Sequence, residues 1–188
     1  MRARSPRTAH LLASLVAAGV ALVAAAAPPT NVPVRLGDVP GTNGQWQQAS
    51  TVVAAPLDEV RGWLTDYDAW PKIFPDVQWA TVLQHDGNLY TVRFRSKIIG
   101  RDMTLRLQIT PRVLVYTGSG KDVTSQGKIT LKPIDRNHTE VLMQSSAEVH
   151  GLAGAFASQG MKRKRSFKKM QSDLTTLHSL AARASTRM

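Results

Sequence analysis

Cysteine is absent from this 188-residue chain. The absence excludes a lipid-modified amino-terminal cysteine, a catalytic thiol and thiolate ligands for a metal ion. It is compatible with an oxidising compartment but does not prove one. The sequence also lacks a glycine-rich phosphate loop and any metal-type spacing of histidine with carboxylates. We therefore predict no catalytic residue, no metal site and no cofactor.

Acidic residues are scarce, with 13 Asp and Glu against 24 Lys and Arg and a formal net charge of +11. Three of the cations, Arg2, Arg4 and Arg7, precede an uncharged apolar run over residues 11–27. This order predicts a signal peptide over residues 1–27, cleaved within residues 24–27, and hence a periplasmic or secreted protein. A retained membrane anchor is the alternative, although the run is short and alanine-rich for a span of about 20 residues.

Residues 28–44 contain four prolines and three glycines without a sustained period, which predicts an extended, partly mobile leader. The remaining residues 45–184 suit one domain with its own core. Apolar and polar residues alternate clearly in its middle, as in Met103, Leu105 and Leu107 against Thr104 and Arg106. Such alternation indicates strands with one buried and one solvated face. We predict seven strands in one antiparallel meander, approximately at residues 45–54, 77–84, 91–98, 103–110, 112–117, 123–132 and 140–149.

Two short helices are expected between the first and second strands. Pro56 suits the first helical position, and Leu57, Val60 and Leu64 recur at helical spacing behind it. A second helix around Trp70 ends before Pro75. Much of the aromatic content of the chain gathers here, at Trp63, Tyr67, Trp70, Phe74 and Trp79.

A long helix is predicted over residues 153–184, with a start near Gly160 as the alternative. One stripe at helical spacing contains Phe156, Gly160, Arg163, Phe167, Met170, Leu174, Leu177 and Ala181. At 100° per residue, four cations fall on the opposite side, namely Lys162, Arg165, Lys168 and Lys169. We predict that these four contact an anionic membrane surface, and a merely solvated helix face is the alternative. We predict no nucleic-acid partner, and the oligomeric state stays open.

The stretch APLDEVRGWLTDYDAWPKIFPDV resembles the opening of the START-like superfamily, which includes Bet v 1-like proteins, polyketide cyclases and coenzyme Q-binding proteins. The resemblance implies an α+β helix-grip fold. In that fold a seven-stranded antiparallel sheet wraps around a long carboxyl-terminal helix, with two short helices between strands 1 and 2. It also implies a tunnel between the sheet and the long helix.

An internal cavity of this kind is typically apolar with a few polar groups that orient a ligand. We predict Arg163 as the polar anchor, although a long cationic side chain more commonly extends to the rim. The predicted ligand-binding residues are Trp70, Phe74, Trp79, Phe94, Met103, Leu105, Leu107, Tyr116, Met143, Phe156, Arg163, Phe167 and Met170. The sequence therefore predicts an exported protein that binds or transfers a hydrophobic small molecule such as a lipid, a quinone or a polyketide-like compound. The alternatives are a cyclase or dehydratase on the same fold, and a membrane-surface module with a filled core.

Overall fold

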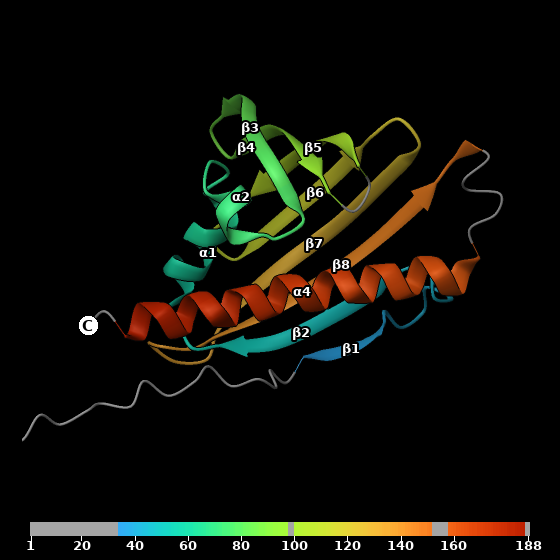
Figure 1. Ribbon diagram of the computed structural model, residues 1–188. Coiled ribbons are helices and arrows are strands. Elements are labelled where there is room, and N and C mark those ends of the chain that lie inside the picture. The colour runs from blue at the N-terminus through green and yellow to red at the C-terminus, as the bar shows by residue number, and fades with distance from the viewer. Residues whose placement is uncertain (1–33, 98–99, 152–157, 187–188) are drawn as a thin grey trace, which may run out of the picture.

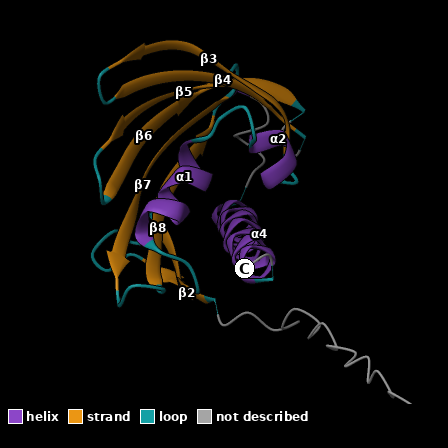
Figure 2. Ribbon diagram, turned by 90° about the vertical axis from the view of Figure 1, so that its left-hand side faces the viewer, coloured by secondary structure: helices purple, strands orange, loops and turns teal. Residues whose placement is uncertain are grey.

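The computed structural model describes residues 34–97, 100–151 and 158–186. It shows an α+β protein in which one antiparallel sheet of eight strands curves around a long helix, α4 (Figure 1). Figure 2 shows α1 and α2 on the same, concave side of the sheet as α4. The elements are β1 (Arg35–Asp38), β2 (Gln47–Val53), α1 (Leu57–Thr65), α2 (Trp70–Ile73), β3 (Val77–Asp86), β4 (Leu89–Ser96), β5 (Arg101–Ile109), β6 (Val113–Ser119), β7 (Val123–Pro133), β8 (Thr139–Val149) and α4 (Gln159–Ser185).

The strand order is β1-β2-β8-β7-β6-β5-β4-β3. Strands β3 to β8 form the expected meander, but β2 pairs with β8 at the far side of the sheet and is not the neighbour of β3. The single meander was therefore wrong at its first strand. The helix pair α1–α2 spans this distance, which explains why two helices interrupt the strands at this point of the chain.

The eighth strand, β1, lies within residues 28–44, which we expected to form a leader without regular structure. Residues Arg35 to Asp38 pair antiparallel with Ser50 to Gln47 of β2. The ordered sheet therefore begins before Gln45. The predicted signal peptide over residues 1–27 lies outside the described residues. Within the described residues, no helix combines the length and the apolar character needed to cross a membrane.

The alternating patterns fold as predicted. In β5, Met103, Leu105 and Leu107 are buried, whereas Arg106 and Gln108 are exposed. The inner faces of the strands thus supply the concave surface of the sheet, and the cations of the alternating stretches lie on the convex surface.

Helix α4 begins at Gln159, where the Ser158 Oγ accepts a hydrogen bond from the Met161 backbone N at 3.3 Å. Ser158 is extended, so α4 does not continue back toward Ala153, which lies outside the described residues, and the alternative start near Gly160 is confirmed. The buried side chains of α4 pack over β2 and β8, and they are Met170, Leu174, Leu177 and Ala181. This part of the stripe is confirmed.

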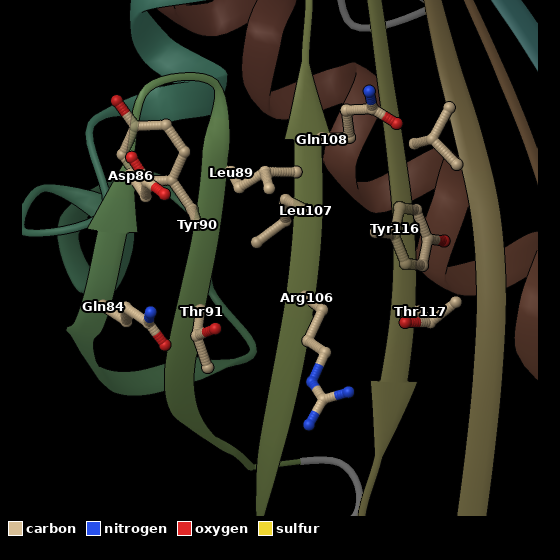
Figure 3. A pocket seen from close by; sticks show the side chains of 11 residues that line it. Gln84, Asp86, Leu89, Tyr90, Thr91, Arg106, Leu107, Gln108, Tyr116 and Thr117 are labelled. Atoms are coloured by element: carbon tan, nitrogen blue, oxygen red, sulfur yellow. The ribbon is translucent and has the colours of Figure 1, made fainter.

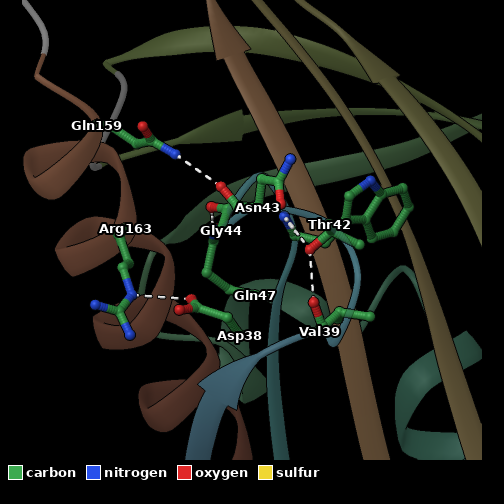
Figure 4. A network of polar contacts seen from close by, with 9 residues as sticks. Asp38, Val39, Thr42, Asn43, Gly44, Gln47, Gln159 and Arg163 are labelled. Atoms are coloured by element: carbon green, nitrogen blue, oxygen red, sulfur yellow. Dashed lines mark hydrogen bonds and ion pairs between the residues drawn. The ribbon is translucent and has the colours of Figure 1, made fainter.

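The first two turns of α4 are hydrogen-bonded to β1 and to the loop between β1 and β2 (Figure 4). Arg163 Nε donates to Asp38 Oδ1 at 2.9 Å, and Gln159 Nε2 donates to the Asn43 carbonyl oxygen at 3.3 Å. These hydrogen bonds connect residues that are over 100 positions apart in the sequence. They hold the start of α4 against β1 and the loop that follows it.

A buried phenol without a partner lies beside α2. Tyr67 is 3% exposed and packs against Trp70, with ring centroids 4.9 Å apart, and against Tyr90, at 5.5 Å. Its hydroxyl has no hydrogen-bond partner among the described residues. Burial and the neighbouring Tyr90 raise the pKa of Tyr67 above its ordinary value of 10.0.

We expect Tyr67→Phe to stabilise the fold by about 1 kcal/mol, because an unsatisfied buried hydroxyl costs about 1–3 kcal/mol. The advantage should grow above pH 10.0, where the unfolded phenol ionises and the folded one does not. Because the folded pKa is raised, ionisation of this phenol leaves the stability of the unmodified protein unchanged below pH 10.0 and lowers it as the pH rises further. Urea unfolding at pH 7 and pH 10.5 measures both effects, and a large loss of stability at pH 7 would contradict the assignment.

Candidate functional site

A cavity of about 570 Å³ lies between the concave face of the sheet and one flank of α4. Its volume falls in the range of about 300–1,000 Å³ that is typical of ligand sites. One end is closed by side chains that are less than 9% exposed, namely Leu64, Phe74, Leu114 and Met170. The closed end is therefore dry and apolar, and α1 and α2 help to form it.

Nine of the thirteen predicted ligand-binding residues line this cavity: Trp70, Phe74, Phe94, Met103, Leu105, Leu107, Tyr116, Met143 and Met170. Trp79, Arg163 and Phe167 do not line it, and Phe156 lies outside the described residues. The strand residues among these nine could be predicted because apolar and polar residues alternate along each strand. All apolar side chains of such a strand therefore lie on the same face of the sheet.

Arg163 was expected to be the polar anchor of the cavity, and the structure places it elsewhere. Its guanidinium is bound to Asp38 and lies 5.1 Å from the ring centroid of Phe167. Asp38 belongs to β1, a strand that was not predicted from the sequence. The unrecognised strand thus accounts for the misplacement of Arg163.

The cavity is bordered by a different line of α4 residues, Lys162, Ser166, Lys169 and Asp173. Successive members are three or four positions apart and therefore lie above one another on the helix. Lys162, Lys169 and Arg165 were expected on the far side of the helix, and that placement was wrong. Helix α4 packs its apolar stripe against β2 and β8, so that the adjacent polar flank faces the hollow. Lys168 is exposed and does not line the cavity.

An ion triad, formed by Asp76, Lys169 and Asp173, lines the cavity. Lys169 Nζ lies 3.1 Å from Asp76 Oδ1 and 2.5 Å from Asp173 Oδ1, and its side chain is 37% exposed. The two carboxylate side chains are only 10% and 14% exposed. Burial raises the pKa of Asp173, and the lysine offsets only part of this effect. Burial lowers the pKa of Lys169, but the two carboxylates outweigh burial and hold it above its ordinary value.

The ring of Tyr116 lies across Gly127 of the neighbouring strand, in the middle of the cavity wall. The two residues are directly paired in the β6–β7 register. A Cβ at position 127 would collide with the Tyr116 ring, so that only glycine allows this approach. Burial raises the pKa of Tyr116, and the hydroxyl therefore stays protonated as a hydrogen-bond donor inside the cavity.

Charged residues gather where the cavity opens. We call Arg101, Lys121, Lys162 and Arg165 the basic mouth, because all four line the cavity and Arg101, Lys121 and Arg165 are exposed. They come from the start of β5, the β6–β7 turn and the first turns of α4. One carboxylate, Asp122, accompanies them and is ion-paired with Arg101. Lys121, Lys162 and Arg165 form no ion pair with any described residue.

A second hollow of about 340 Å³ lies on the other side of the sheet, over β3 to β6 (Figure 3). Exposed polar side chains such as Gln84, Asp86, Arg106 and Gln108 line it. It is smaller and more polar than the interior cavity. In the part of the chain that the structure describes, no group of three His, Asp or Glu side chains is arranged to hold a metal ion.

Sequence reasoning missed the two acidic members of the triad and two members of the basic mouth, Arg101 and Lys121. Asp173 carried a usable signal, because it stands four positions after Lys169 on the predicted helix. Asp76 and Lys121 lie at the ends of strands, where only the three-dimensional arrangement shows which surface a side chain faces.

Comparison with known proteins agrees with this geometry. Residues 47–182 match the model of a family described as polyketide cyclase/dehydrase and lipid transport. The comparison with curated proteins returned no match.

Solved structures with the same fold include a START superfamily protein from Mycobacterium smegmatis, with a TM-score of 0.64 and 12% identity, covering 74% of this chain and 98% of that one. A STAR-related lipid transfer protein from Xanthomonas axonopodis gives a TM-score of 0.62 at 16% identity, covering 79% and 92% of the two chains. The Zhui aromatase/cyclase from Streptomyces sp. R1128 gives 0.60 at 17% identity, covering 82% and 94%. At these identities the similarity establishes the fold alone, which is the START-like fold predicted from the sequence.

Proposed function

Because the chain belongs to the polyketide cyclase/dehydrase and lipid transport family, we propose that it binds a hydrophobic small molecule in the interior cavity and transfers it. The observation that carries the proposal is a hollow of about 570 Å³, walled by aromatic, leucine and methionine side chains and open at one end. Burial of each ligand methylene group contributes about 0.8 kcal/mol. Association and ordering cost about 4–15 kcal/mol, so an alkyl chain of moderate length would be held reversibly. Reversible binding is what a transfer protein requires.

The test is native mass spectrometry of the protein purified from its own host, together with extraction of any bound compound. We expect an apolar small molecule in stoichiometric amount, and displacement of the neutral dye Nile red by added lipids. A protein that carries no ligand and does not bind the dye would refute the proposal.

A second candidate function is cyclase or dehydratase chemistry in the same cavity. One of the similar structures, Zhui, is named an aromatase/cyclase. The observation in its favour is the ion triad, which places a carboxyl group of raised pKa beside an ammonium group inside the cavity. The extraction experiment discriminates between the two functions. A carrier returns the bound compound unchanged after incubation, whereas a cyclase returns one that has lost water or gained a ring.

We also propose that the protein is exported and collects its ligand at an anionic membrane. The charged and then apolar amino-terminal sequence supports export. The first turns of α4 support docking, because Lys164 and Lys168 are exposed there without an ion pair to any described residue, and Met161 is 46% exposed. The cavity opens beside these residues, so docking would bring its opening to the lipid surface.

We expect Lys164→Gln/Lys168→Gln to weaken binding to anionic vesicles about 30-fold at low salt, since each lysine near such a surface contributes about 1 kcal/mol. Co-sedimentation with vesicles of phosphatidylglycerol and of phosphatidylcholine measures this. The matched control is Lys128→Gln/Arg136→Gln, which removes two exposed charges outside α4. Equal binding of the unmodified protein to both vesicle types would exclude electrostatic docking.

A further inference from the structure

The charges that line the cavity are distributed unevenly along it. The basic mouth has four cations and one carboxylate, whereas the ion triad has two carboxylates and one cation. Lys162 and Asp173 are 11 positions apart on α4, which corresponds to a rise of about 16 Å. Along α4, the lining of the cavity is therefore positive at the first turns and carries excess negative charge about two to three turns further on.

We propose that the ligand is an amphiphile with one anionic head, held with its head at the basic mouth and its apolar part in the closed end. The inference rests on the proposed function and specifies the chemical class of the ligand. Lys121, Lys162 and Arg165 have no carboxylate partner among the described residues, so that an incoming anion need not displace one. Arg101 is already neutralised by Asp122 and contributes less.

The ion triad and the apolar end select the orientation. An anionic head that passed the basic mouth would meet the excess negative charge of the triad, whose two carboxylate side chains are only 10% and 14% exposed. The side chains of Leu64, Phe74, Leu114 and Met170 offer it no hydrogen bond. The same residues accept an alkyl chain or ring at no electrostatic cost. Both ends of the cavity thus favour the same orientation of the ligand, which enters with its apolar part first and leaves its anionic head at the basic mouth.

The test compares ligands that differ only in the head. Hexadecanoate, methyl hexadecanoate and hexadecylamine, at monomeric concentrations, compete with Nile red for the full-length protein at pH 7.5. We expect hexadecanoate to displace the dye at a concentration about tenfold lower than its methyl ester, and hexadecylamine to be the weakest. Monohexadecanoyl glycerol phosphate against monohexadecanoyl glycerol repeats the comparison for a phosphate head and shows which anion is preferred. The preference should decrease as the salt concentration rises.

The decisive variant is Lys121→Gln/Lys162→Gln/Arg165→Gln, which should erase the preference for the anionic head while Nile red still binds. Its matched control is Arg112→Gln/Lys128→Gln/Arg136→Gln, with the same loss of charge at exposed positions that do not line the cavity. The control should retain the preference. The proposal is overturned if the acid and its ester compete equally, or if the mouth variant keeps the preference and loses only vesicle binding. If Nile red binds but no amphiphile displaces it, the proposed ligand class is wrong, whereas the proposed function fails only if the protein binds neither the dye nor any ligand.

Discussion

Replacement of Leu105 by tryptophan is expected to reduce ligand uptake at least about 100-fold while the protein stays folded. Leu105 is on the inner face of β5, lines the cavity and is 9% exposed. A larger side chain there extends into the hollow and occupies the volume that a ligand needs. Because the hollow is open space, the overpacking penalty should stay at the low end of about 1–3 kcal/mol. Nile red titration measures uptake, and urea unfolding measures the stability of each variant.

Two further variants make this result interpretable. Met143→Phe fills the cavity from β8 with a smaller increase in size and should weaken uptake to an intermediate degree. Gln108→Trp places the same indole on the exposed face of β5 and should leave uptake unchanged. Uptake that survives both cavity substitutions in folded protein would show that the ligand site is elsewhere.

The residues of the cavity wall could be identified in the sequence because their positions follow from local periodicity. An apolar side chain in an alternating strand has only one face to occupy, and the curvature of a long antiparallel sheet directs that face inward. The aromatic cluster could be found for a similar reason, since Pro56 and Pro75 delimit the helix pair. These elements depend on neighbours that are close in the chain.

The misplaced residues depend on neighbours that are distant in the chain. The face of α4 that borders the cavity is set by β2, β8 and the unexpected β1, and no feature of the helix sequence encodes the position of those strands. The stripe from Met170 to Ala181 was correct because it packs directly on the sheet. Two residues that precede this stripe, Arg163 and Lys169, exchanged their expected roles. The predicted anchor, Arg163, binds Asp38 at the surface, and the predicted surface lysine, Lys169, forms the ion triad inside.

Because Lys169 forms the ion triad, its substitution is expected to have the largest effect on the stability of the protein. Lys169→Met should destabilise the protein by about 3 kcal/mol, because removal of one partner from a buried ion pair leaves the others uncompensated at a cost of about 3–5 kcal/mol. The partial exposure of Lys169, 37%, places the expected value at the low end of this range. Methionine keeps an apolar stem of similar length and removes only the ammonium group, which also lies 5.6 Å from the ring centroid of Phe74, so that the loss reports the charge. Lys168→Met, at the exposed neighbouring position, should change stability by less than about 0.5 kcal/mol.

The pH dependence separates this ionic role from loss of packing. The folded pKa of Lys169 is raised, so its contribution is complete below pH 10.5 and is lost as the pH rises through the folded value. The deficit of Lys169→Met should therefore shrink above pH 10.5. It should also shrink in acid, where Asp173, whose pKa burial already raises above 3.8, takes up a proton and no longer needs a cation. A deficit that stays constant from pH 4 to pH 11 would mean that Lys169 acts through packing, and the ion triad would then have no energetic role in closing the cavity.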